Sequence, residues 1–270
     1  MQLGFRIAVQ RLLIFVKLLQ FSRFGGPGLL VVGGTLLLAF AGCGGGGGGA
    51  SVPTSTPSAT PIATSISASC DSTTYTPNYY GLPEPGGNDT SADVYTFWRQ
   101  FPISVYIPSG TDAAFRTATL AGFDQWVDAT GGRATYQLVS SASNADLVVS
   151  YSPQDPNSDT LGLTTVTYNA SQHYIISAKM ELFFYTTSQR ADANAANQSI
   201  AAHEFGHALG ISTHSPFVAD LMYPSLERTR EVVSTRDLNT LKTIYCNNFP
   251  TRSTAKLKNE GPTKTIVIRN

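Results

Sequence analysis

The order of apolar and polar residues between positions 94 and 248 predicts a body of mixed strands and helices. Short runs rich in branched and aromatic side chains, bounded by Pro, Gly, Asn or Ser, are typical of strands. Such runs occur at residues 101–108, 134–139, 145–151, 161–168 and 174–184. Helical segments interrupt this series and follow it. The pattern therefore predicts an α+β fold.

Three helices are predicted. The first is expected at 111–128, with Thr111 as its N-cap and one apolar face in the core. That face consists of Leu120, Phe123 and Val127, with Trp126 beside them. The other two are expected at about 192–209 and 234–245, the last with a capping box of Ser234 and Asp237.

Residues 1–42 have the composition of an export signal. Four basic residues and no acid accompany the apolar run 29–40, which is short for a transmembrane helix. The run ends in Phe-Ala-Gly-Cys43, which resembles a bacterial lipobox, so Cys43 is expected to be lipidated. Lipid chains there would hold the protein in the bacterial cell envelope, at the membrane or cell surface. An uncleaved signal anchor is the alternative.

The segments on either side of the body differ from it in composition. Residues 43–69 contain six consecutive glycines and then Ser, Thr, Pro and Ala, which predicts a flexible linker. The folded domain is expected at 70–248, with an irregular lead-in before about residue 94. Residues 249–270 form a basic tail, in which 265–268 could add a strand or fray.

The 18 basic and 18 acidic residues cancel, but they are unevenly distributed. Four basic residues and no acid lie before position 43, and the tail from 249 holds five basic residues and one acid. The remaining 9 basic and 17 acidic residues give the region 43–248 a net charge of −8. A nucleic-acid binder needs a basic face, so no nucleic-acid partner is expected.

The chain has three cysteines, and lipidation of Cys43 leaves Cys70 and Cys246. An even remainder in an exported protein predicts a disulfide. Because these two cysteines stand near the ends of the expected domain, their bridge would join its termini.

The chemistry is concentrated in one stretch, His-Glu-Phe-Gly-His at 203–207. Residues four apart share one helix face, so His203 and His207 can point at a common atom. Imidazole nitrogens suit Zn²⁺, which in catalytic sites keeps one position open for water. Glu204 can take a proton from that water. Gly210 can end the helix in the left-handed conformation, and the reversal can return His214 as a third ligand.

The histidine stretch and the later Asp-Leu-Met-Tyr-Pro at 220–224 together resemble the zinc-binding motif and the Met-turn of metzincins. Met-Tyr-Pro is the matrixin form of that turn. The resemblance is strong over 203–224 and extends as a layout over 94–248. It departs at Thr213, where metzincins place the third histidine, because here the histidine comes one residue later, at His214.

The resemblance implies a matrixin-like zinc metalloendopeptidase with a twisted, mostly parallel mixed sheet, an active-site helix, a Met-turn and a C-terminal helix. One catalytic zinc would be bound by His203, His207 and His214 above Met222, with Glu204 as general base for a zinc-activated water. A protein or peptide substrate would lie extended along the strand 161–168, which the resemblance implies is an edge of the sheet, and contact Gly162, Leu163 and Thr164.

Several alternatives remain open. Asp220 could replace His214 as third ligand. Cys70 could block the zinc as the propeptide cysteine of matrixins does, although its flanks lack the arginine, glycine and proline of that switch. The protein could also be a non-catalytic envelope lipoprotein that uses this fold to bind peptides or a partner, or a spacer whose working part is the linker.

Two further metal questions arise from the composition. The fourth histidine, His173, falls in a turn between strands and lacks partner ligands, so no second, structural zinc is expected. Calcium could be bound by Asp155, Asp159 and loop carbonyls.

Overall fold

The computed structural model describes residues 75–79, 82, 95–154, 158–226, 231–251 and 261–269. All described residues belong to the unit Pro61–Asn270. The expected signal peptide, the linker, Cys43 and Cys70 lie outside the described residues. None of the described helices is both long enough and apolar enough to cross a membrane.

The described strands form one six-stranded mixed sheet in the order β2-β1-β3-β5-β4-β6. Their bounds are β1 Ile103–Tyr106, β2 Tyr136–Leu138, β3 Leu147–Pro153, β4 Gly162–Asn169, β5 Ile175–Phe184 and β6 Thr263–Arg269. The first four strands in that order are parallel, and β4 is antiparallel to both of its neighbours. The α+β class and the mostly parallel sheet predicted from the sequence are therefore confirmed.

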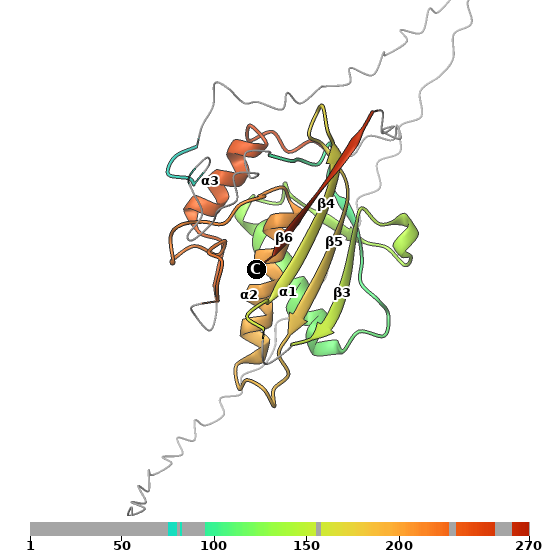
Figure 1. The fold of residues 1–270 in the computed structure, drawn as a ribbon, viewed down its shortest axis with the longest axis vertical. Coiled ribbons are helices and arrows are strands. Elements are labelled where there is room, and N and C mark those ends of the chain that lie inside the picture. Colours follow the sequence, from blue (N-terminus) through green and yellow to red (C-terminus); the bar gives the residue numbers. More distant parts are fainter. Residues whose placement is uncertain are drawn as a thin grey trace, which may run out of the picture. The chain divides into compact units, whose positions relative to one another are not determined.

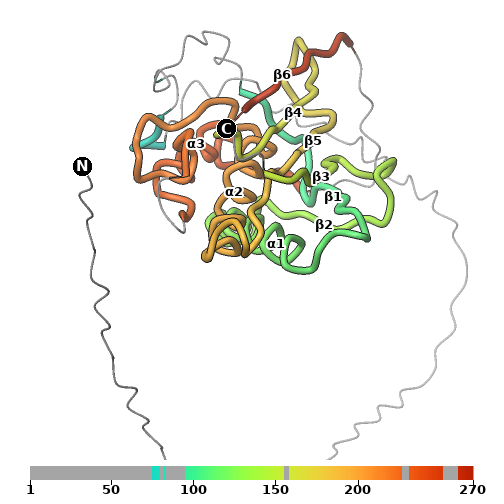
Figure 2. The backbone as a smooth tube through the Cα atoms, turned by 60° about the horizontal axis from the view of Figure 1, so that its bottom comes forward, coloured from blue at the N-terminus to red at the C-terminus, as the bar shows by residue number. Residues whose placement is uncertain are grey.

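Three α-helices accompany the sheet in the described part of the chain. They are α1 Ala113–Ala129, α2 Ala193–Ala208 and α3 Thr235–Ile244, and a short 3₁₀ turn lies at Ala142–Asn144. Helix α2 packs against β4, β5 and α1. In Figures 1 and 2, α1 and α2 lie on one face of the sheet, and α3 lies beyond α2.

The contact between α1 and α2 is close because it combines small residues with stacked aromatic rings. Phe123 of α1 stacks on Phe205 of α2 with ring centroids 4.0 Å apart. Trp126 is fully buried, and its Nε1–H donates to the carbonyl oxygen of Ala202 at 2.7 Å. Gly122 leaves room for the backbone of α2, since a Cβ built there would lie 2.7 Å from the Ala202 nitrogen. The face of α1 that was expected in the core therefore packs against α2 and holds that helix in position.

The first helix begins later than predicted, because Asp112 and not Thr111 is its N-cap. Oδ1 of Asp112 accepts hydrogen bonds from the N–H groups two and three residues later, at 2.8 and 3.3 Å. A carboxylate there also interacts favourably with the positive end of the helix dipole. The capping box of Ser234 and Asp237 at the start of α3 is confirmed.

The prediction that residues 161–168 form an edge strand is wrong. Strand β4 lies between β5 and β6, and its outer side pairs with β6 from Leu163–Arg269 to Asn169–Thr263. The tail thus adds a strand, the first of the two outcomes considered for it. Pairing satisfies the N–H and C=O groups that an edge would leave to water. Among the described strands, β2 and β6 are the edges.

We predict that Gly122→Ala destabilises the fold, whereas Gly110→Ala does not. The methyl group at 122 would meet backbone atoms of α2, and overpacking of this kind costs about 1–3 kcal/mol. Gly110 is exposed, and no atom lies within 4 Å of the position that a Cβ would take there, so its replacement should change stability by less than about 0.5 kcal/mol. Urea unfolding measures both. Equal stabilities would contradict the proposed close contact.

Candidate metal centre

Helix α2 is a core helix, since thirteen of its 16 residues are buried. His203 and His207 lie one turn apart on it and are 3% and 0% exposed. The helix ends in a glycine turn: the N–H of Gly210 donates to the carbonyl oxygen of His207, and that of Ile211 to the carbonyl oxygen of Gly206. Gly210 has φ +119°, the left-handed region expected for it.

The turn brings a third imidazole to the other two. Nε2 of His203 and Nε2 of His207 are 3.0 Å apart, and Nε2 of His207 and Nε2 of His214 are 3.3 Å apart. His214 is 5% exposed, so all three rings are shielded from water. The third histidine therefore reaches the other two, although it stands one residue later than in metzincins.

The backbone fixes the orientation of two of these rings. Nδ1 of His203 lies 2.7 Å from the carbonyl oxygen of Leu221, and Nδ1 of His207 lies 2.6 Å from that of Ile211. A carbonyl accepts only, so both Nδ1 atoms carry the proton and both Nε2 atoms present lone pairs. Metal-bound histidines commonly have such a second partner, which orients the ring.

The donor set and its spacing fit a zinc ion. Tetrahedral zinc with Zn–N distances of about 2.0–2.1 Å places its nitrogen ligands about 3.3 Å from one another. The observed separations of 3.0 and 3.3 Å are close to that value. In the described ranges, His203, His207 and His214 are the one group of His, Cys, Asp or Glu side chains placed to bind a metal.

Burial keeps the two helix imidazoles neutral. Desolvation, with a smaller contribution from His214, lowers the pKa of His203 to about 3. Desolvation and the neighbouring imidazoles also hold the pKa of His207 well below its ordinary value. Metal binding requires a neutral imidazole ring, so near pH 7 these two histidines do not have to lose a proton before they bind a metal.

The alternative third ligand, Asp220, is engaged elsewhere. Both of its carboxylate oxygens accept hydrogen bonds from Arg236, each at 2.8 Å, and Oδ2 also accepts from the hydroxyl of Ser215 at 2.6 Å. The N–H of Ser215 donates to the carbonyl oxygen of Met222. Asp220 thus stabilises the loop that follows His214, and the geometry favours His214 as the ligand.

Glu204 is fully buried beside strand β4. Its Oε2 accepts a hydrogen bond from the hydroxyl of Thr164 at 2.5 Å, and its Oε1 has no partner among the described residues. Gly162 makes this approach possible, because a Cβ there would overlap Oε1. Burial raises the pKa of Glu204 to about 8, against the lowering effect of the Thr164 bond. The side-chain role of Thr164 was missed from the sequence, which suggested only main-chain contacts to substrate.

Met222 packs against helix α2. It is fully buried, and its Sδ would be 2.5 Å from a Cβ built on Gly206, which stands between the two histidines of α2. Its neighbour Leu221 supplies the carbonyl that orients His203. This position corresponds to the floor expected of the Met-turn.

Asp237 connects the Met-turn to α3 and to the lead-in. Its carboxylate accepts hydrogen bonds from the N–H groups of Leu221, Met222 and Ser234 and from the hydroxyl of Tyr79. Burial and the charge of Asp220 raise its pKa to about 6, while the bonds from Ser234 and Leu221 lower it. The sequence identified Asp237 only as a capping residue.

The segment 75–79 is held on α3 by three further hydrogen bonds. The N–H groups of Tyr75 and Tyr79 donate to the hydroxyls of Thr243 and Thr240, each at 3.2 Å. The side chain of Asn239 donates to the carbonyl oxygen of Pro77 at 3.0 Å. The irregular lead-in expected from the sequence is thus attached to the helix that supports the Met-turn.

The remaining predicted residues lie outside this group. His173 has φ +60° in the β4–β5 turn, and its N–H donates to the carbonyl oxygen of Asn169. Cys246, after α3, is disulfide-bonded; its predicted partner Cys70 is outside the described residues, so the pairing stays a prediction. Asp155 is also outside them, Asp159 belongs to no described metal group, and calcium binding stays a prediction.

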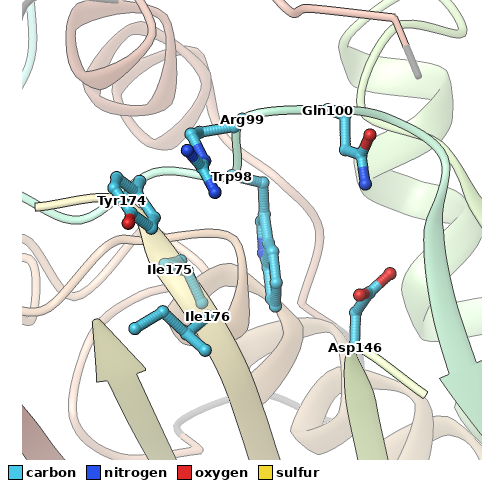
Figure 3. A pocket seen from close by; sticks show the side chains of 7 residues that line it. All are labelled: Trp98, Arg99, Gln100, Asp146, Tyr174, Ile175 and Ile176. Atoms are coloured by element: carbon cyan, nitrogen blue, oxygen red, sulfur yellow. The ribbon is translucent and has the colours of Figure 1, made fainter. Parts of the chain in front are cut away.

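A separate pocket of about 110 Å³ is lined by residues 98–100, Asp146 and 174–176 (Figure 3). Its charged groups interact with the chain itself. The guanidinium carbon of Arg99 lies 3.7 Å from the centroid of the Tyr174 ring, and Asp146 accepts a hydrogen bond from the N–H of Ser104 at 2.6 Å. No imidazole lines this pocket, so it does not compete with the histidine group as a metal centre.

A comparison with known protein families identifies the same region of the chain. The family model for matrixin, a peptidase family, matches residues 99–246, which include the sheet from β1 to β5, the three helices and the histidine group. A search of curated proteins found no match to the chain.

We predict that His214→Ala releases zinc and that Asp220→Ala retains it. Removing a direct ligand should weaken zinc binding by more than the roughly 10–100-fold that is typical when only a residue orienting a ligand is changed. Asp220→Ala should keep one zinc per chain, because its carboxylate binds Arg236 and Ser215. Competition with a chromogenic chelator measures both affinities. Zinc loss in the Asp220 variant alone would reverse the assignment.

We also predict unequal costs for two helix-capping carboxylates. Asp237→Ala should destabilise the protein by about 2–4 kcal/mol at pH 8, since it leaves several buried donors unpaired. Asp112→Ala removes an exposed cap and should cost about 1 kcal/mol. Denaturant titration gives both free energies of unfolding. A cost at Asp237 no greater than at Asp112 would show that it does not hold the Met-turn.

Proposed function

The chain belongs to the matrixin family of metalloproteases, and on this basis we propose that it is a zinc-dependent endopeptidase acting on protein or peptide substrates. One observation carries the proposal: three buried imidazoles present converging Nε2 atoms, and a buried carboxylate with one unpartnered oxygen follows the first of them in sequence. Three imidazoles with an adjacent carboxylate suit amide hydrolysis, because they can hold a metal and accept a proton from water.

His203, His207 and His214 would hold the metal. When bound, zinc would lower the pKa of a water towards 7 and polarise the scissile carbonyl. The carbonyls of Leu221 and Ile211 keep the Nε2 lone pairs directed at the metal position. The protein's contribution here is orientation and exclusion of bulk water, since all three rings are buried.

Glu204 is the proposed general base. Thr164 fixes Oε2, which leaves Oε1 as the atom that accepts a proton from the attacking water. The same oxygen can return that proton to the leaving amine nitrogen. A carboxyl group whose pKa is raised to about 8 by burial can both accept and donate near neutral pH, and a nearby dication would lower that value.

Localisation is also part of the proposal. The lipobox-like sequence before Cys43 and the linker 43–69 suggest an exported lipoprotein whose peptidase domain stands away from a membrane surface. Substrates would then be proteins of the cell envelope or its surroundings.

A non-catalytic peptide-binding protein is the less favoured alternative. Its main support was the extra residue before His214. That residue does not prevent the third imidazole from joining the other two.

We predict that Glu204→Ala keeps zinc and loses cleavage. Loss of a general base should lower the rate by about 10²–10⁴-fold. The measurement is cleavage of a reduced and alkylated protein at equal zinc content, with and without a chelator. Asp128→Ala, an exposed carboxylate change on α1, is the matched control and should keep the wild-type rate. A zinc-loaded Glu204→Ala protein that cleaves as fast as the wild type would eliminate Glu204 as the base.

A further inference from the structure

Strand β6 occupies the side of β4 where an extended substrate would be expected to pair. Its seven residues, Thr263–Arg269, form an antiparallel ladder with 163–169 of β4. Figure 1 shows β6 as the outermost strand, lying along β4. Strand addition of this kind is also how many proteins bind extended peptides, through main-chain hydrogen bonds.

The carboxyl end of β6 lies opposite the residues around Glu204. Arg269 pairs with Leu163, and Ile268 pairs with Thr164, whose hydroxyl binds the Glu204 carboxylate. Directly opposed residues of an antiparallel pair place their side chains on the same face of the sheet. Ile268 therefore lies on the α2 face, opposite Thr164, and it is only 6% exposed.

The rest of β6 is held as a bound peptide would be. Ile268 is its one buried side chain, Ile266 is half-buried, and the other five are exposed. Val267 on the opposite face is 57% exposed. Attachment therefore depends mainly on the ladder to β4, which any extended chain without proline could form.

We propose that β6 is an internal occupant of the substrate-binding side of β4, and that it keeps the peptidase latent until a protein substrate or partner displaces it. This inference rests on the proposed peptidase function. Only the fraction of molecules with β6 detached can accept a substrate along β4, so the apparent affinity for substrate falls by that fraction. Ile268 acts as the anchor of the occupant, because it is the one buried side chain of β6 and faces the same side of the sheet as Thr164.

The first test compares Ile268→Asp with Val267→Asp in the full, zinc-loaded chain. A charge on the buried face should detach β6 and raise kcat/KM for an unfolded protein by roughly tenfold or more, whereas the same charge on the exposed face should change it less than about twofold. If the wild-type chain cleaves the substrate, unchanged or reduced cleavage by folded, zinc-loaded Ile268→Asp overturns the proposal. An equal increase of kcat/KM in both variants also overturns it, because the effect would then not depend on which face of β6 carries the charge.

The second test needs no cleavage. A fluorescent peptide with the sequence of residues 263–269 should bind the Glu204→Ala/Ile268→Asp chain and should bind Glu204→Ala alone at least roughly tenfold more weakly, since β6 then competes. Fluorescence anisotropy measures both. Equal affinities, or no binding to either, overturn the proposal. A further outcome is that the zinc-loaded Ile268→Asp and wild-type chains both fail to cleave while the peptide still binds the double variant more tightly than Glu204→Ala. That result would contradict the proposed enzymatic function but would support the occupancy of β4 by β6.

The third test uses the wild-type chain and so does not depend on a variant that folds. Excess unlabelled 263–269 peptide should accelerate amide hydrogen exchange of the chain's own β6 residues, because it competes for β4. Exchange of the β3–β5 amides should stay constant as the internal control. No acceleration in β6 at peptide concentrations that saturate the double variant overturns the proposal.

Discussion

The imidazole lone pairs of His203 and His207 meet inside the protein, and a protein interior does not favour that arrangement unless a cation joins them. The Nδ1 hydrogens of His203 and His207 are directed at backbone carbonyls, so their Nε2 atoms face each other without a donor between them. Buried polar groups without a partner cost free energy, and a bound dication would remove that cost. Metal binding and folding should therefore be coupled, with part of the affinity for zinc appearing as stability of the folded domain.

The surrounding structure supplies close packing on one side of this group and hydrogen bonds on the other. On the α2 side, Gly122 and Gly206 let α1 and Met222 approach the helix backbone. On the loop side, Asp237 binds the N–H groups of Leu221 and Met222, and Leu221 in turn orients His203. The position of one ligand thus depends on a carboxylate at the start of α3, in a different part of the sequence.

The sequence predicted what depends on local spacing and did not predict what depends on distant pairing. The capping box at Ser234, the shared face of His203 and His207 and the turn at Gly210 follow from helical spacing and turn chemistry, which neighbouring residues determine. The edge position of β4 was predicted wrongly, because its outer partner lies about a hundred residues away and strand propensity does not identify partners. The cap at Asp112 was missed by one residue, since Thr and Asp both suit that position.

The contact between Tyr79 and Asp237 sets a limit on N-terminal processing of the protein. Residues 75–79 lie on α3, and the Tyr79 hydroxyl is one of the donors that hold the Asp237 carboxylate. A cut before Tyr75 would keep the hydrogen bonds that Tyr75 and Tyr79 donate to Thr243, Thr240 and Asp237. A cut after Tyr79 would remove a donor from the carboxylate that fixes the Met-turn, and through Leu221 would loosen His203. Removal of N-terminal residues therefore keeps this support of the Met-turn only when the cut lies before residue 75.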